Sequence, residues 1–282
     1  MTKLKLALCQ IKVADNKEQN VEKAVEMIST SADKNADIAV LPEMFNCPFQ
    51  NDKFIEYSEE EENSPTLEAI SKIANEKNIY VLAGSIPEKV IGEDSKEKIY
   101  NTSFFFDDNG KIIAKHRKMH LFDIDIPEKG VHSKESEVIT PGDKFSVIDT
   151  KFGKIGMALC YDVRFPELAM LMALNGAKIL FYPGAFTLVT GAAHWELLFK
   201  SRAVDNQVFC VGVSPATNED LKYHAYGHSI VVNPWGDILI EAGSDENLLF
   251  QEIDLEEVDK IREELPTLKN RRSDLYKIDF KG

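Results

Sequence analysis

Cysteine is scarce in this sequence, and its few cysteines form no disulfide or metal motif. Cys9, Cys47, Cys160 and Cys210 are scattered over 282 residues, with no CxxC spacing and no cluster with histidine. This spacing argues against a disulfide-rich secreted scaffold and against the common structural zinc sites. We therefore expect a protein of the reducing cytoplasm, in which Cys9, Cys47 and Cys210 are small packing residues.

The sequence also lacks a long apolar run and an excess of positive charge. No stretch reaches the roughly 18 apolar residues that a membrane-spanning helix needs. Residues 1–15 alternate apolar side chains with lysine, as a strand does and a signal peptide does not. Lysine and arginine number 33 against 47 acidic residues, which gives a net charge of -14. Because an acidic surface repels phosphate backbones and anionic lipid, we expect neither nucleic acid nor membrane as a partner.

Helical and strand periodicities alternate along the chain, and no linker, tandem repeat or low-complexity segment divides it. This pattern predicts an α/β protein, a single domain over 1–282 in which helices cover two sheets. One helix should start at Ser64 and Pro65, a cap followed by a favoured first residue. The expected elements are strands at 4–11, 37–43, 79–85, 144–150, 154–160, 177–183 and 207–214, helices near 21–28, 67–74, 165–175 and 192–205, hairpins at 100–118 and 228–242, a long loop over 120–143, and a final strand and helix within 249–265.

The segment KIGMALCYDVRFPEL, residues 154–168, places one cysteine at the end of an apolar strand. Asp162 and Arg164 follow Cys160, and Pro166 opens a helical pattern. A side chain at such a strand end is held rigidly over a cleft, and the amides of the next turn can stabilise a thiolate or an oxyanion. Cys160 is therefore a candidate nucleophile. The alternative is a small core residue, which is the commoner role of an isolated cysteine.

An acid and a base also stand at predicted strand ends. Glu43 closes DIAVLPE, and Lys118 closes GKIIAKHRK. Strand ends gather at one edge of an α/β fold, so these side chains should meet Cys160 there. A carboxylate can take the thiol proton, and an ammonium can stabilise a thiolate or an oxyanion. Alternatively, Glu43 caps a helix and Lys118 is solvated. His116 and His120 are expected to support the lysine loop.

Together these segments resemble the nitrilase superfamily of carbon-nitrogen hydrolases. The resemblance runs through nearly the whole chain, with its three main motifs in the family's order. It implies an αββα sandwich of the nitrilase type, a Glu-Lys-Cys triad, and a homodimer in which the tail from about residue 266 makes dimer contacts. The matching segments are LPEMF, HRKMHLFD, CYDVRFPEL, TPGDKF, YPGAFT, HWELLFKSRAVDNQ, YGHSIVVNPWG and RRSDLY.

Within that superfamily the chain is most similar to omega-amidases, which hydrolyse the terminal amide of α-ketoglutaramate and α-ketosuccinamate. The segments HLFDID, YPGAFTLVTGAAHWELL, RAVDNQ and RRSDLY carry this finer resemblance. It implies that Arg164 binds the substrate carboxylate, and that Phe186 and Thr190 line the site. A guanidinium suits a carboxylate because its fork matches the two oxygens. Alternatively, Arg164 forms a structural ion pair with Asp162 or Glu167.

Three further positions concern the substrate. The family has a second glutamate at the site, which maps to Glu135, with Glu137 as the alternative. The omega-amidase pattern has tyrosine where FNCPF places Phe49. The missing phenol removes one hydrogen bond, worth about 1 kcal/mol, so Phe49 should affect the substrate preference and not the reaction. Arg202 is a second candidate contact for an anion.

The implied chemistry acts on a small amide and needs no metal or organic cofactor. Glu43 takes the Cys160 proton as the thiolate attacks. Lys118 and the N–H of Tyr161 receive the oxyanion. Ammonia leaves, and water hydrolyses the thioester with help from Glu43 and Glu135. The rivals are a related amidase acting on deaminated glutathione or an N-carbamoyl amine, a true nitrilase, and a non-catalytic binding subunit.

Overall fold

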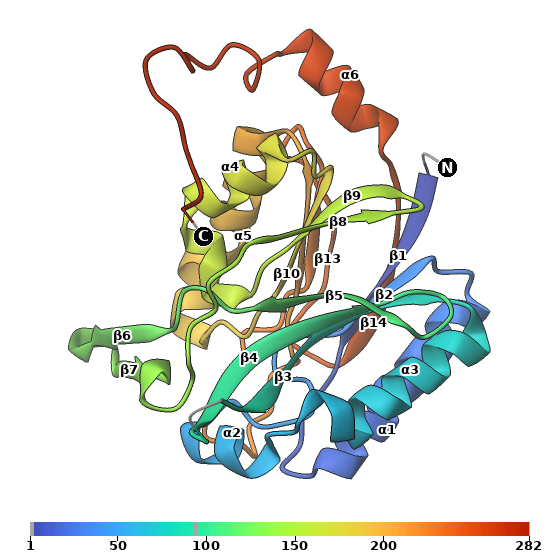
Figure 1. Ribbon diagram of the computed structural model, residues 1–282, viewed down its shortest axis with the longest axis vertical. Helices are drawn as coiled ribbons and strands as arrows, with labels where there is room; N and C mark the ends of the chain where they lie inside the picture. The colour runs from blue at the N-terminus through green and yellow to red at the C-terminus, as the bar shows by residue number, and fades with distance from the viewer. Residues whose placement is uncertain (1–2, 93–94, 282) are drawn as a thin grey trace.

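Two six-stranded sheets face each other in the computed structural model, which describes residues 3–92 and 95–281 (Figure 1). The first sheet contains, in order across it, β14 (Asn247–Asp254), β1 (Lys3–Gln10), β2 (Ile38–Val40), β3 (Tyr80–Ile91), β4 (Glu97–Phe106) and β5 (Ile112–Arg117). The second contains β13 (Ile238–Glu241), β12 (Ile230–Val232), β11 (Phe209–Val213), β10 (Ile179–Pro183), β9 (Gly153–Met157) and β8 (Ser146–Thr150).

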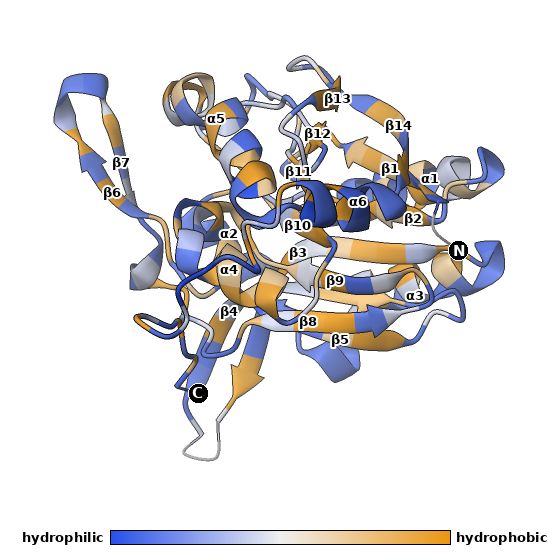
Figure 2. Ribbon diagram, turned by 90° about the horizontal axis from the view of Figure 1, so that it is seen from above, coloured by the Kyte–Doolittle hydropathy of each residue, from blue (hydrophilic) through white to orange (hydrophobic). Residues whose placement is uncertain are grey.

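Strand β1 shows why the two sheets stack. Leu4, Leu6 and Leu8 belong to the apolar cluster between the sheets, whereas Ala7 and Cys9 belong to the cluster on the outer face. A strand that is apolar on both faces needs a partner layer on each side, because successive side chains point in opposite directions. Figure 2 shows the result, with hydrophobic strands stacked in the middle of the molecule and hydrophilic segments outside.

Helices form the outer layers. On the first sheet lie α1 (Lys17–Asp33) and α3 (Pro65–Lys77), and on the second lie α4 (Pro166–Leu174) and α5 (Leu188–Asn206). The short α2 (Asn51–Tyr57) and the late α6 (Glu256–Glu264) complete the helices (Figure 1). Helix α3 begins as predicted, since Ser64 Oγ accepts from Leu67 N at 3.0 Å. The αββα sandwich is thereby confirmed. None of the helices in the described ranges is long and apolar enough to span a membrane.

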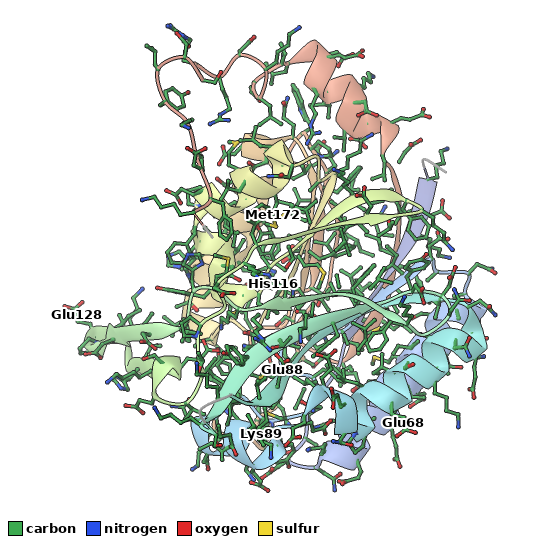
Figure 3. All side chains as sticks on the ribbon, in the orientation of Figure 1. Glu68, Glu88, Lys89, His116, Glu128 and Met172 are labelled. Atoms are coloured by element: carbon green, nitrogen blue, oxygen red, sulfur yellow. The ribbon has the colours of Figure 1, made fainter. Side chains whose placement is uncertain are left out.

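Several predicted boundaries were wrong. The strands expected over 37–43 and 154–160 end earlier, β2 at Val40 and β9 at Met157, so Glu43 and Cys160 lie beyond their strands and not at the strand ends. Helix α5 starts at Leu188 and not near 192, because Thr187 caps it and accepts from the N–H of Thr190. The predicted loop over 120–143 contains a hairpin of β6 (Asp123–Ile126) and β7 (Val131–Lys134), which turns at Gly130 in the left-handed region. Its four-residue strands are too short for periodicity to predict. The hairpin projects from the sandwich, with Glu128 at its tip (Figures 1 and 3).

The central strands of both sheets run parallel and end at one edge. In the first sheet β1, β2 and β3 are parallel neighbours, and in the second β9, β10 and β11 are. Carboxyl ends of parallel strands meet at the same edge, where ligands bind in α/β folds. The segments that follow β2, β9 and β10 are therefore brought together from two separate layers.

Candidate active site

Glu43 lies in a turn just beyond β2, and its side chain is fully buried. Its Oε1 accepts from Asn101 Nδ2 and from Lys118 Nζ, each at 2.9 Å. Its Oε2 accepts from the N–H of Ala185 at 2.9 Å. Glu43 is thus not a helix cap, which was the alternative. Because Ala185 follows β10, the last of these contacts joins the two sheets.

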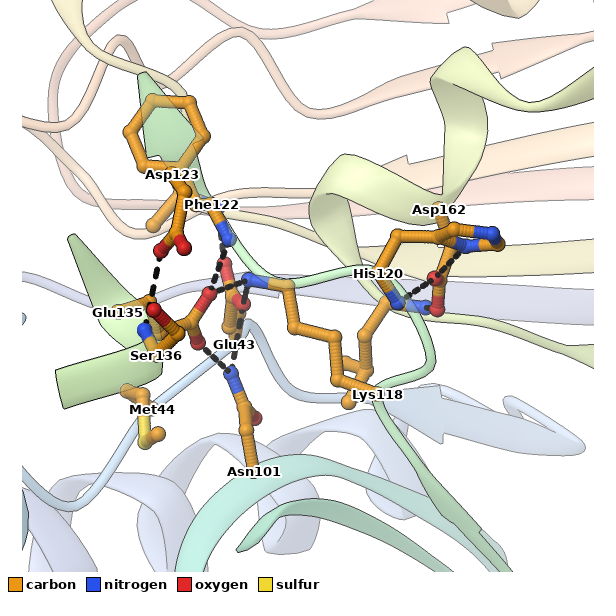
Figure 4. Close-up of polar contacts among 12 residues, drawn as sticks. Glu43, Met44, Asn101, Lys118, His120, Phe122, Asp123, Glu135, Ser136 and Asp162 are labelled. Carbon is orange, nitrogen blue, oxygen red and sulfur yellow. Dashed lines mark hydrogen bonds and ion pairs between the residues drawn. The ribbon is translucent and has the colours of Figure 1, made fainter. Parts of the chain in front are cut away.

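Lys118 lies just beyond β5 and bridges two buried carboxylates (Figure 4). Its Nζ donates to Glu43 Oε1 at 2.9 Å and to Glu135 Oε2 at 2.7 Å. Burial alone would lower the pKa of Lys118, but the charges of Glu135 and Glu43 hold this pKa well above its ordinary value. The ammonium is therefore charged at neutral pH, and Lys118 is not the solvated lysine that was the alternative.

Glu135, and not Glu137, completes this buried cluster. Glu135 is 1% exposed, and its Oε2 accepts from the N–H of Phe122 at 2.7 Å as well as from Lys118. Burial and the charge of Glu43 raise the pKa of Glu135, although Lys118 opposes the shift. Glu137 is exposed, and it lies 3.7 Å from an exposed lysine of the hairpin. The sequence left these two glutamates open, and the structure brings only Glu135 into contact with Lys118.

Cys160 opens a tight turn, the 3-10 helix η4 (Cys160–Arg164), at the same edge of the sandwich. Its φ of 43° lies in the left-handed region, which a non-glycine residue rarely adopts. Gly184 permits this approach, since a Cβ there would stand 3.1 Å from the Cys160 Cα. Burial raises the pKa of the thiol well above its ordinary value, and the charge of Glu43 adds to the shift while Lys118 opposes it. The resting thiol is therefore protonated, and it needs a base when it attacks.

Asp162 ties the cysteine turn to the lysine loop (Figure 4). Its buried carboxylate accepts from the N–H of Leu159 at 3.0 Å and from the N–H of His120 at 2.9 Å. The His116 and His120 rings contact it at 3.2 and 2.8 Å. Burial would raise the pKa of Asp162, but the two histidines hold it far below its usual range. His116, which lies near the middle of the molecule in Figure 3, supports the site as expected.

Arg164 is a cation without a counter-charge near Cys160. No ion pair within residues 3–92 and 95–281 includes it, so the alternative of a structural ion pair is not observed. Its guanidinium lies 4.7 Å from the Phe186 ring and 5.6 Å from the Tyr161 ring, and Nη1 lies 3.2 Å from His194 Nδ1. Burial lowers the pKa of Arg164. Arg202, by contrast, is buried and donates to a main-chain carbonyl of η4 at 2.7 Å.

A cleft of about 540 Å³ leads toward this cluster, between the β6–β7 hairpin, α2 and the start of α5. Phe49 and Tyr223 line both the cleft and a small pocket that reaches Glu43. The Phe49 ring lies 5.7 Å from Lys118 Nζ. Phe49, which was predicted to affect the substrate preference, is therefore next to the site. Thr190 is buried in the cap of α5, where its hydroxyl lies 2.9 Å from that of Thr187.

Sequence reasoning missed three residues of this site. Asn101 bridges the two glutamates, Tyr223 donates its hydroxyl to the carbonyl of Ala185, and Asp162 was considered only as a partner for Arg164. Asn101 offered a signal, because it is a polar residue inside the apolar strand YNTSFFF. Tyr223 offered none, since its segment has no periodicity and no motif.

Comparison with known proteins agrees with this geometry. The carbon-nitrogen hydrolase family model matches residues 5–263. The omega-amidase NIT2-A of Xenopus laevis is 47% identical over 100% of this chain and 99% of its own length, and the human omega-amidase NIT2 is 45% identical over the same shares. The crystal structure of Nit3 from Saccharomyces cerevisiae, a member of branch 10 of the nitrilase superfamily, has a TM-score of 0.87 and 44% identity, with 96% of this chain and 97% of Nit3 covered. The chain therefore belongs to the carbon-nitrogen hydrolase family, within the nitrilase superfamily.

Proposed function

We propose that this carbon-nitrogen hydrolase is an omega-amidase, which converts α-ketoglutaramate and α-ketosuccinamate to the keto-dicarboxylate and ammonia. One observation carries the proposal: an unpaired Arg164 stands four residues beyond a buried thiol that faces a glutamate-lysine cluster. The cluster suits attack on an amide, and the guanidinium suits the carboxylate at the other end of the substrate. The names of relatives such as the human omega-amidase NIT2 point to the same substrates.

In the first half of the proposed reaction, Cys160 Sγ bonds to the amide carbon while Glu43 takes the thiol proton. The carbonyl π electrons move to oxygen, and the oxyanion is stabilised by Lys118 and by the N–H of Tyr161. Collapse of this intermediate breaks the C–N bond, and Glu43 gives the proton to the leaving nitrogen. Ammonia departs, and the acyl group remains on Cys160 as a thioester.

In the second half, water hydrolyses the thioester. Glu43 takes a proton from the water as the oxygen of this water bonds to the acyl carbon, and Glu135 helps to orient the water. Lys118 again stabilises the oxyanion. The C–S bond breaks, the thiolate recovers the proton from Glu43, and the carboxylic acid leaves. Atoms and protons balance over these two halves without a metal or an organic cofactor.

Turnover by the purified wild-type protein tests this proposal. It is measured as ammonia release, except for deaminated glutathione, whose amide nitrogen belongs to a peptide and leaves as an amine. The panel contains α-ketoglutaramate, α-ketosuccinamate, deaminated glutathione, an N-carbamoyl amine and a nitrile of matched length. We expect turnover to be fastest on the two keto-acid amides. Preference for another member of the panel would overturn the proposed substrate but not the proposed reaction class. A folded protein that is inactive on every member would favour the non-catalytic binding subunit.

Replacement of Arg164 should separate acidic from neutral substrates. Because a charged hydrogen bond contributes about 1.5–3 kcal/mol, Arg164→Met should lower kcat/KM for α-ketoglutaramate roughly 10- to 150-fold, mainly through KM. A neutral primary amide of similar length should be hydrolysed almost as well as by the wild type. Lys129→Met removes a cation that lines the cleft and is the matched control, with a smaller effect. Equal losses on acidic and neutral amides would exclude carboxylate binding by Arg164.

We further propose that the protein acts as a homodimer. Leu197 and Val204 on one face of α5, together with Trp235, form an exposed apolar patch, and the tail exposes Leu275 and Tyr276. The family resemblance implies that the tail contacts a second copy of the chain, and we propose the same occupant for the patch on α5 and Trp235. Light scattering should give twice the 31.8 kDa mass of the chain. A monomer at micromolar concentration would exclude a stable dimer. The four cysteines, all free and buried, support the cytoplasm as the proposed compartment.

A further inference from the structure

Asn101 lies where the two glutamates of the site face each other. It belongs to β4 and is fully buried, and its side-chain amide nitrogen donates to Glu43 Oε1 at 2.9 Å and to Glu135 Oε1 at 3.1 Å (Figure 4). Its main-chain carbonyl accepts from the N–H of Lys118 at 2.8 Å. Asn101 therefore forms a hydrogen bond with each of the three residues of the cluster, to the two carboxylates through its side chain and to the main chain of Lys118 through its carbonyl.

The cluster has more acidic groups than basic ones. Two carboxylates, Glu43 and Glu135, share one ammonium, that of Lys118, in a place with almost no solvent. Like charges this close normally force one carboxyl group to hold a proton. Hydrogen bonds donated to the ionised form oppose that outcome. The Asn101 amide supplies two such bonds, one to each carboxylate, in parallel with the two that Lys118 donates.

We propose that Asn101 is a positioning residue that keeps both glutamates ionised and spaced, so that Glu43 is available as the base at neutral pH. This inference rests on the proposed roles of Glu43 and Cys160. Both N–H bonds of the amide are used on the carboxylates, while the buried Asn101 Oδ1 has no hydrogen-bond partner among the described residues. An orphaned oxygen is costly. The opposite orientation of the amide would turn that oxygen toward two negative charges, which explains why the orphan is tolerated.

Other groups also face the base and enter its pH dependence. They are Lys118 beyond β5, Glu135 in the turn Glu135–Glu137, Cys160 in η4, and Tyr223 before β12. Asn101 differs from these groups because its side chain does not titrate. Because it carries no titratable proton, its removal changes the hydrogen bonds to the carboxylates and leaves the number of charges the same.

The test compares Asn101→Leu, which removes both donors in a similar volume, with Asn101→Ser, which keeps one. Two pH profiles are measured between pH 5 and 9: kcat/KM for ammonia release, and the rate at which iodoacetamide alkylates Cys160. We expect Asn101→Leu to lose at least about 10-fold in kcat at pH 7. Its acid limb should move up by about one pH unit, with KM little changed. Asn101→Ser should fall between the wild type and the leucine variant, and it carries the test if Asn101→Leu does not fold.

Asn206→Leu is the matched control, because Asn206 is also a buried asparagine whose Oδ1 lacks a partner, at the far end of α5. It should lower thermal stability without moving either profile. Unchanged acid limbs in both Asn101 variants would overturn the proposal and leave Asn101 a structural residue. If the wild type releases no ammonia but the alkylation profile still moves, the proposed substrate fails and the role of Asn101 stands.

Discussion

Cys160→Ala is expected to abolish ammonia release while the sandwich stays folded. The thiol forms the covalent intermediate in the proposed reaction, and loss of such a nucleophile costs at least about 10⁴-fold in kcat. The other cysteines are buried in packing positions, so none can replace it. Alanine is as strained as cysteine at a φ of 43°, so melting temperature should change by only a few degrees. Turnover and circular dichroism of the same preparation check both expectations.

Cys47→Ala is the matched control for the nucleophile. Cys47 lines the small pocket that reaches Glu43, and burial raises the pKa of its thiol well above the ordinary value. Its removal should leave ammonia release within a few-fold of the wild type. Appreciable turnover by Cys160→Ala in a clean preparation, or loss of turnover by Cys47→Ala alone, would contradict the assignment of the nucleophile.

Lys118→Met is expected to remove both activity and stability. The methionine fills a similar volume but leaves Glu43 and Glu135 without their cation in a buried site. Breaking a buried ion pair by removing one partner costs about 3–5 kcal/mol of unfolding free energy. Loss of one group that stabilises an oxyanion costs about 10²–10³ in kcat. Urea unfolding and single-turnover kinetics measure the two losses separately.

The stability loss of Lys118→Met should depend on pH. In the wild type, the raised pKa of Lys118 means that its contribution is present below its unfolded pKa of about 10.4 and is lost as pH rises through the higher folded value. In the variant, Glu135 keeps a raised pKa without the opposing lysine, so its ionised form destabilises the fold. The deficit should therefore shrink as pH falls from 8 toward 5.

Lys115→Met controls for the loss of any lysine on β5. Lys115 pairs with Glu61 and Glu88 and its side chain is 39% exposed, so its removal should cost about 1 kcal/mol or less. A Lys118→Met deficit that is equally small, or one that stays constant from pH 8 to pH 5, would contradict the view that Lys118 stabilises two buried carboxylates.

The existence of the strands before the site residues was the most predictable part of this protein, although β2 and β9 end before Glu43 and Cys160. The apolar runs before Glu43, Lys118 and Cys160 are local patterns, and strands that end together bring the residues after them together. The αββα sandwich itself was implied by family resemblance, because periodicity predicts helices and strands but does not choose how two sheets are layered. The extent of a single domain over 1–282 and the use of the tail in dimer contacts stay predictions.

The contacts that orient the cluster could not be predicted. Asn101 and Lys118 are 17 positions apart and meet between neighbouring strands of the first sheet. Glu43 and Ala185 are separated by 142 positions, so the contact between them exists only after both sheets have stacked. Tyr223 donates to the carbonyl of Ala185, a main-chain contact that leaves no trace in side-chain pattern. The β6–β7 hairpin was missed for another reason, since its alternation of Asp123, Ile124, Asp125 and Ile126 is too brief to distinguish from a loop.

The proposed reacting groups belong to opposite halves of the sandwich, with Glu43 and Lys118 beyond strands of the first sheet and the Cys160 turn beyond a strand of the second. The apolar side chains between the sheets therefore also set the distance between the proposed nucleophile and base. A misplacement of about 1 Å can cost 10²-fold in rate. The substitutions that are tolerated among these apolar side chains are therefore limited by the geometry of the reaction as well as by folding, although the side chains lie far from any substrate. Adding or removing one methylene group there can leave the protein folded and still lower its catalytic rate.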